Sequence, residues 1–192
     1  MSDKRADRLK SIETNVWVEF IEMSFKYKPV NLGQGFPDFA APQHVRQALS
    51  DAVLNDEDVL LNQYTRDCGH PRLVNVLSKL YSKLINRQID AQNEILITSG
   101  AYEALFCTFM AFVNPCDEVI IIEPFFDCYE PMTRMAGGIP VFVALRPRLG
   151  VVTPQTSADW VLDFEELESK FSSKTKFIII NTPNNPLGKV FN

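Results

Sequence analysis

The sequence predicts an α/β domain with a mainly parallel β-sheet and flanking helices. Three short apolar runs, 118–123, 140–145 and 176–181, are rich in β-branched residues and lack polar alternation, as in strands buried on both faces. A fourth run, at 95–97, has the same composition. Helical patterns separate the runs and leave room for crossovers between parallel strands. With 192 residues and 46% hydrophobic content, the chain can form one domain of ordinary size, or one domain with an attached arm.

The residues before this sheet predict helices joined by irregular loops. Residues 11–28 place apolar side chains about one helical turn apart, and Pro42 fits the start of a second helix. A stripe of leucines predicts a third helix that begins near Pro71. Residues 31–39 contain two glycines and a proline, so we expect a loop that is either a connector or a wall of a site.

Three more helices are predicted between and after the first strands. Residues 101–113 form a helical pattern that ends at an Asn-Pro pair, and residues 129–136 form another that ends at two glycines. Asp163 is placed to cap a helix over residues 164–171, with Glu166 at the third helical position as in a capping box.

Charge and cysteine content argue against nucleic acid, anionic membranes and metal ions as partners. The net charge is −5 and the basic residues are scattered, which argues against nucleic acid and an anionic membrane as partners. The four cysteines contain no C-x-x-C pair and only two histidines could assist them, so we expect reduced thiols and no metal site. We see no secretory signal and no run long enough to span a bilayer, and expect a cytoplasmic protein, with a mitochondrial location left open.

The strand-to-helix turn at residues 99–101 is a candidate anion site. Gly100 allows a close turn, and the N–H groups of Ala101 and Tyr102 would lie at the positive end of the following helix. Such turns also occur for packing reasons alone, so the rest of the chain has to decide whether a phosphate binds here.

Two further segments reach the same edge of the predicted sheet, because ligands gather beyond the carboxyl ends of parallel strands. Phe126 could stack on a flat ring, although Phe125 and Phe126, taken separately, are of a type found more often in the core than on a ligand. The amides of Asn181 and Asn185 could donate to a phenolate or carboxylate oxygen, or could cap the turns beside Pro183 and Pro186. Together the three segments could hold a flat, phosphorylated ring.

Other chemistries fit this edge less well. No G-x-G-x-x-G follows a strand and no P-loop is present, which argues against nicotinamide and nucleotide cofactors. His44 and His70 lie away from the edge, so a hydrolase with a serine or cysteine nucleophile lacks its base.

Four segments, 31–39, 61–65, 123–131 and 181–191, together closely resemble the kynurenine aminotransferases, also called cysteine-S-conjugate β-lyases or glutamine transaminase K. The resemblance covers nearly the whole chain and implies the large-domain fold of pyridoxal-phosphate aminotransferases. It implies an arm with a substrate-side loop over residues 1–43, and the first part of the cofactor-binding domain over residues 44–192.

The resemblance also implies roles for residues that hold pyridoxal 5'-phosphate. The amides of Ala101 and Tyr102 would bind its phosphate, and Tyr64 would reach the phosphate of the neighbouring subunit in a homodimer. Phe126 would lie on the pyridine ring. Asn185 would hydrogen-bond the phenolic oxygen, with support from Asn181.

Substrate contacts follow from the same resemblance. Gly35 would approach the substrate carboxylate closely, Asn185 would lie near that carboxylate, and Trp17 would line the side-chain pocket. The implied reaction is transamination of amino acids such as L-kynurenine and glutamine with 2-oxo acids, with β-lyase activity toward cysteine conjugates as a second outcome.

The sequence departs from the family pattern because it stops at Asn192, before the segments expected to carry the Schiff-base lysine and other catalytic groups. Lys189 matches none of those positions, so we expect residues 1–192 alone to be inactive. If the predicted strands keep the positions that the resemblance implies, only those at Val119 and Val141 are neighbours, which would leave open edges prone to association. A non-catalytic isoform that pairs with a full-length subunit and an unrelated α/β binding module remain alternatives.

Overall fold

A computed structural model describes residues 4, 6–10, 12, 16–35, 37–150, 153 and 156–191. The chain divides into two compact units, one of residues 14–98 and one of residues 1–13 with 99–192. The predicted functional division at residue 43 is a different boundary and stays a prediction.

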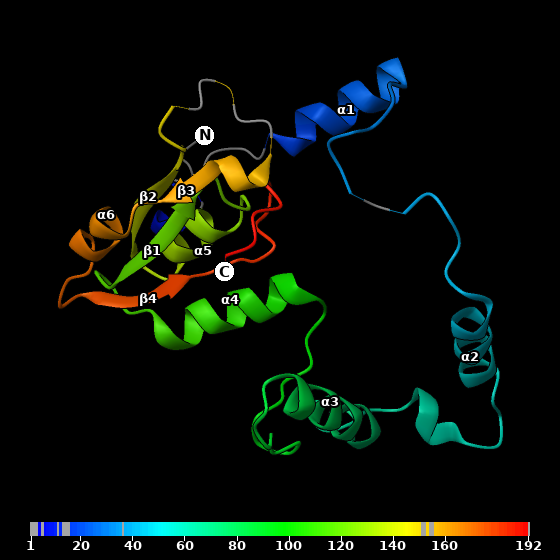
Figure 1. The fold of residues 1–192 in the computed structure, drawn as a ribbon. Coiled ribbons are helices and arrows are strands. Elements are labelled where there is room, and N and C mark those ends of the chain that lie inside the picture. The colour runs from blue at the N-terminus through cyan, green and yellow to red at the C-terminus, as the bar shows by residue number, and fades with distance from the viewer. Residues whose placement is uncertain are drawn as a thin grey trace. The chain divides into compact units, whose positions relative to one another are not determined.

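A four-stranded sheet forms the centre of the unit that contains residues 99–192 (Figure 1). The strands are β1 (Glu118–Glu123), β2 (Ile139–Pro147), β3 (Trp160–Leu162) and β4 (Thr175–Ile179), in the order β3-β2-β1-β4. β1 pairs in parallel with both β2 and β4, and β3 adds an antiparallel edge. The predicted α/β class with a mainly parallel sheet is therefore confirmed.

The core of this unit lies between β1 and its helices α4 (Ala101–Phe112) and α5 (Tyr129–Met135). The four central residues of β1 are buried, as expected for a strand with neighbours on both edges and cover on its faces. Phe109 of α4 is 1% exposed and its ring packs edge-on against Phe177 of β4, with 5.2 Å between centroids. This contact holds the helix that begins at the candidate anion site against the sheet.

Two predictions about the sheet were wrong. Residues 95–97 form no strand, since a strand needs a neighbour and no other strand of the described chain pairs with them. Instead the Ile97 N–H donates to the Cys68 carbonyl at 3.0 Å. The expectation that only the strands at Val119 and Val141 are neighbours was also wrong, because Val119 is paired with Phe177 of β4 as well.

The cap of α6 (Phe164–Ser169) is confirmed, but the capping box is not formed. The Asp163 side chain accepts from the N–H groups of Glu165 and Glu166, at 2.9 and 3.1 Å. The Glu166 carboxylate instead pairs with the Arg146 guanidinium on β2. This pair lowers the pKa of Glu166, first through the hydrogen bond from Arg146, and joins α6 to the sheet.

The unit of residues 14–98 is helical, with α1 (Trp17–Tyr27), α2 (Gln43–Val53), η2 (Val59–Asn62) and α3 (Pro71–Leu84). All three predicted α-helices are present. The predicted start of the first one falls partly on residues 11 and 13–15, which lie outside the described residues.

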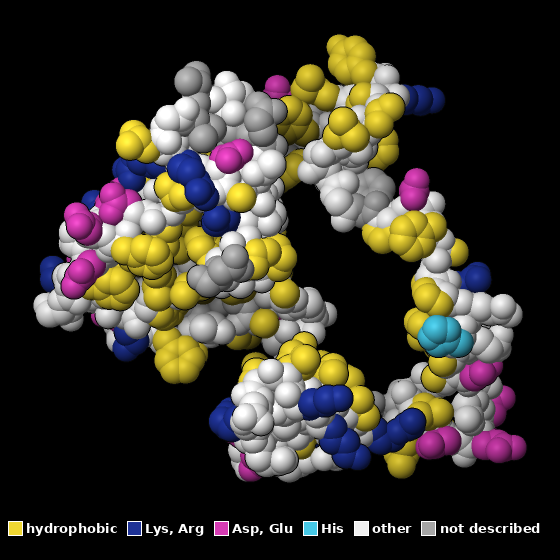
Figure 2. All heavy atoms as spheres, viewed as in Figure 1, with side chains coloured by type: hydrophobic (Ala, Val, Ile, Leu, Met, Phe, Trp, Pro, Cys, Tyr) yellow, Lys and Arg dark blue, Asp and Glu magenta, His cyan; other side chains and the backbone are white. Residues whose placement is uncertain are grey.

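Large apolar side chains are exposed on α1 and α2 (Figure 2). Phe25 is 79% exposed and Leu49 is 67% exposed, so the other described residues of their own unit leave these side chains uncovered. Aggregation of the isolated chain stays a prediction. No helix among the described residues is long and apolar enough to cross a membrane.

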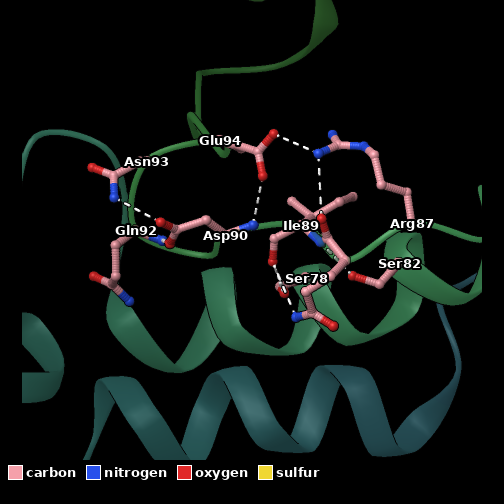
Figure 3. Close-up of polar contacts among 9 residues, drawn as sticks. Ser78, Ser82, Arg87, Ile89, Asp90, Gln92, Asn93 and Glu94 are labelled. Carbon is pink, nitrogen blue, oxygen red and sulfur yellow. Dashed lines mark hydrogen bonds and ion pairs between the residues drawn. The ribbon is translucent and has the colours of Figure 1, made fainter.

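Residues after α3 are folded back onto that helix by a polar network (Figure 3). Ser78 and Ser82 lie one turn apart and bind both main-chain groups of Ile89: the Ser78 hydroxyl donates to its carbonyl at 2.7 Å, and the Ser82 hydroxyl accepts from its N–H at 2.9 Å. Glu94 continues the network by accepting from Arg87 and from the Asp90 N–H, both at 2.7 Å. These bonds lower the pKa of Glu94, and the largest contribution is the bond from Asp90.

Replacement of Ser78 by alanine is expected to lower the free energy of unfolding by about 1–3 kcal/mol, because the buried carbonyl of Ile89 loses its short donor. Ser50→Ala on exposed α2 is the matched control, and should be neutral or slightly stabilising because alanine has the higher helix propensity. Urea denaturation measures both. Equal effects of the two substitutions would contradict the role of Ser78.

Candidate functional site

The start of α4 has the conformation expected of an anion cradle. Gly100 has φ 89° and ψ 169°, a region that is essentially restricted to glycine. A Cβ at Gly100 would meet no atom within 4 Å, so the space beside it is open. Helix geometry leaves the first-turn N–H groups, which include those of Ala101 and Tyr102, without an intrahelical carbonyl. The Glu103 carboxylate accepts from the Ser99 N–H and fixes the approach to the helix.

The ring of Phe126 lies next to the start of α4. Its centroid is 6.3 Å from that of Tyr102, with the rings nearly perpendicular at 89°, and 6.0 Å from that of Tyr129. Phe126 and its neighbour Phe125 are both partly buried and pack against the core, and Phe125 also stacks on Phe142 with 5.6 Å between ring centroids. Phe125 therefore serves the core, and Phe126 lies between the core and the proposed anion cradle.

The loop after β4 carries the two predicted amides. The Asn185 N–H donates to the Asn181 side-chain oxygen at 2.6 Å, so Asn181 fixes the main chain from which the exposed Asn185 side chain projects. The predicted support of a cofactor contact of Asn185 by Asn181 stays a prediction. Their contacts with a cofactor stay predictions.

Sequence reasoning missed Asn184, which is only 6% exposed. Its side-chain Nδ2 donates to the Pro124 carbonyl at 3.2 Å, and its Oδ1 accepts from the Leu187 N–H at 3.1 Å. The loop that carries Asn185 is thereby tied to the turn that carries Phe126. A doubled asparagine between two prolines was the available signal, but the pattern alone does not tell which amide points inward.

Burial raises the pKa values of the hydroxyl and thiol groups around Phe126. The pKa of Tyr102 is raised by burial, then by the neighbouring Cys128 and Asp127, and that of Tyr129 by burial and Cys128. Burial also raises the pKa of Cys128 to about 11. Both phenols and this thiol are therefore neutral near neutral pH, and the phenols can donate hydrogen bonds.

Cys128 is expected to react with iodoacetamide much more slowly than Cys116. Cys128 is 1% exposed and has a raised pKa, so few molecules carry the reactive thiolate, whereas Cys116 is exposed. Mass spectrometry of peptides after timed labelling measures the two rates, and Cys116→Ser is the control that removes the fast site. Faster labelling of Cys128 would contradict the burial of this side of the site.

The other predicted residues belong to the unit of residues 14–98. Trp17 lines a groove of about 460 Å³ between α1 and the loop at 29–34, and its ring lies 3.8 Å from where a Cβ on Gly33 would be. Gly35 follows this loop, and a Cβ there would meet no atom within 4 Å. Tyr64 is fully exposed. No described protein atom therefore requires glycine at position 35, and the Tyr64 ring is available to a ligand or to another chain.

The described residues contain no cluster of three His, Cys, Asp or Glu side chains that could hold a metal ion. Ala101, Tyr102, Phe126, Asn181 and Asn185 lie in one unit, where the ring contact and the amide bonds above connect their segments. Trp17, Gly35 and Tyr64 lie in the other unit.

A family model described as aminotransferase class I and II matches residues 27–192. The chain belongs to this aminotransferase family. The resemblance inferred from the four motifs is thereby confirmed at the level of the family, and the partial aminotransferase fold with it.

Individual relatives agree with this assignment. The chain is 54% identical to mouse kynurenine–oxoglutarate transaminase 3 over 98% of its own length and 41% of the relative, and 52% identical to rat kynurenine–oxoglutarate transaminase 1 over 97% and 44%. Among solved structures, Bna3p, a putative kynurenine aminotransferase from Saccharomyces cerevisiae, aligns with a TM-score of 0.83 and 37% identity, over 95% of this chain and 44% of that one. The chain thus spans about two-fifths of the length of these relatives.

Proposed function

We propose that the chain is the N-terminal part of a pyridoxal-phosphate aminotransferase that transfers the amino group of amino acids such as L-kynurenine and glutamine to 2-oxo acids. The observation that carries this proposal is the linked edge of the sheet. The glycine turn before α4, the ring of Phe126 and the amide loop at 181–188 are connected by the Tyr102–Phe126 contact and the Asn184–Pro124 hydrogen bond.

The residues at this edge fit pyridoxal 5'-phosphate. The first-turn N–H groups of α4 suit a phosphate, because they carry partial positive charge and the space beside Gly100 is open. The Phe126 ring suits a pyridine face, and an amide such as that of Asn185 can donate to a phenolic oxygen. When bound, this cofactor supplies a ring that takes up the electrons left when a substrate loses its Cα proton.

The chain's own residues would bind and orient the reactants. Ala101 and Tyr102 would hold the phosphate through their amides, while Asn185, with its main chain fixed by Asn181, would place the ring and lie near the substrate carboxylate. For the unit of residues 14–98, we propose that Gly35, where a Cβ would meet no atom within 4 Å, leaves room for a substrate carboxylate, and that Trp17 contacts an aromatic or sulfur-containing substrate side chain. Tyr64, fully exposed in one chain, would complete the phosphate site of a second chain in a homodimer.

Release of a leaving group from Cβ of a cysteine conjugate is the second outcome that we propose for the same site. Both outcomes start with loss of the same Cα proton, so the balance between them depends on the leaving group of the substrate and not on a second set of residues.

The test is an assay of the protein expressed from its complete reading frame. We expect a visible absorbance band from bound pyridoxal phosphate and amino transfer from L-kynurenine to a 2-oxo acid. Asn185→Ala should weaken cofactor binding by about tenfold or more, since one hydrogen bond to a charged oxygen contributes about 1.5–3 kcal/mol. Absence of cofactor binding in the unsubstituted protein would overturn the proposal.

A further inference from the structure

Asn184 differs from the other two asparagines of the loop after β4 in being buried. It is 6% exposed, whereas its neighbour Asn185 is exposed and Asn181 is half-buried. A buried amide loses its hydrogen bonds with water, and its position is therefore fixed by the partners that replace them.

Asn184 closes its own loop with three of its hydrogen-bonding groups. Its N–H donates to the Lys189 carbonyl at 2.8 Å, its carbonyl accepts from the Gly188 N–H at 2.7 Å, and its Oδ1 accepts from the Leu187 N–H at 3.1 Å. These bonds define the shape of the turn at 184–189, at whose start Asn185 lies.

The fourth group of Asn184 leaves the loop. Its Nδ2 donates at 3.2 Å to the carbonyl of Pro124, which is 60 positions earlier in the sequence and directly precedes the Phe125–Phe126 pair. On the other side of Asn184, the Asn185 N–H is held by Asn181 at 2.6 Å. The main chain around Asn185 is thus held by two hydrogen bonds, one to the Asn181 side chain just after β4 and one from Asn184 to the turn after β1.

We propose that Asn184 is a positioning residue that sets the Asn185 amide relative to the ring of Phe126. The Asn185 amide can then donate to the phenolic oxygen of the cofactor while the Phe126 ring covers the face of the cofactor ring. This inference rests on the proposed function. In this proposal Asn184 makes no contact with the cofactor. It acts only through the two segments that it joins, the turn after β1 and the loop after β4.

Two substitutions separate this role from ordinary buried packing. Asn184→Asp keeps the size of the side chain and the acceptor for Leu187, but places an oxygen where Nδ2 donated to Pro124. Asn184→Ala removes both bonds without adding charge. Asn55→Ala is the control, because the Asn55 side chain accepts from Glu57 and Asp58 at 2.9 and 2.8 Å on an exposed turn in the other unit.

The protein expressed from its complete reading frame is titrated with pyridoxal phosphate, and the absorbance of the bound cofactor is followed against pH. We expect both Asn184 variants to raise the dissociation constant by about tenfold or more and to shift the pH midpoint of the absorbance change. Hydrogen exchange in the cofactor-free protein is expected to speed up at the Leu187 N–H in Asn184→Ala and much less in Asn184→Asp. Asn55→Ala should match the unsubstituted protein in all three measurements.

The outcomes distinguish this inference from the proposed function. Unchanged affinity and unchanged pH midpoint in folded Asn184 variants, with normal binding by the unsubstituted protein, would overturn the positioning role alone. A lower melting temperature with an unshifted midpoint at saturating cofactor would also overturn it, because that is the result of a purely structural role. If the unsubstituted protein binds no cofactor, the proposed function fails and the positioning role fails with it.

Discussion

Replacement of Phe109 by alanine is expected to lower the free energy of unfolding by about 3–5 kcal/mol, which is the usual cost of removing a buried phenylalanine ring. Phe109 is 1% exposed and packs edge-on against Phe177, so its loss leaves a cavity between α4 and β4. Urea denaturation followed by circular dichroism measures the loss.

Phe112→Ala is the matched control for this prediction. Phe112 lies on the same helix three residues later and is 60% exposed, so its truncation should change the free energy of unfolding by less than about 1 kcal/mol. If the two variants lose similar stability, the packing of α4 against the sheet is not what holds this unit together.

The sheet could be predicted from the sequence because each of its long strands carries its own signal. The Ile-rich run of β1 and the runs of β2 and β4 are short, apolar and bounded by turn residues, and these features are local. Strand pairing is not local. Residues 95–97 have the composition of a strand but form none, and β4 pairs with β1 although the resemblance implied that these two strands are not neighbours.

The site shows the same limit at the level of single side chains. The glycine at position 100 could be predicted from the turn before a helical pattern, and its positive φ agrees, although the strand predicted before the turn is absent. The inward orientation of the Asn184 side chain could not be predicted, because it depends on the carbonyl of Pro124, which is far away in the sequence. Similarly, Glu166 has the right spacing for a capping box, but the guanidinium of Arg146 on a neighbouring strand takes its carboxylate instead. A charged partner from another element outweighs one exposed main-chain N–H.

Replacement of Gly100 by alanine is expected to weaken binding of pyridoxal phosphate by about tenfold or more, which corresponds to about 1.4 kcal/mol or more. The substitution has two effects. Alanine is strained at φ 89° and ψ 169°, at a cost of about 1–3 kcal/mol, and its methyl group would occupy the open space beside the first turn of α4. Only the second effect acts directly on a bound phosphate.

Gly150→Ala separates these effects, because Gly150 has φ 86° and also faces open space, but lies in the loop after β2. Both variants should lose stability through backbone strain, and only Gly100→Ala should lose affinity for the cofactor at a temperature where both are folded. Cofactor titration of the two purified variants measures the difference. Equal affinities would mean that the phosphate does not lie against Gly100, and would contradict the proposed anion site at the start of α4.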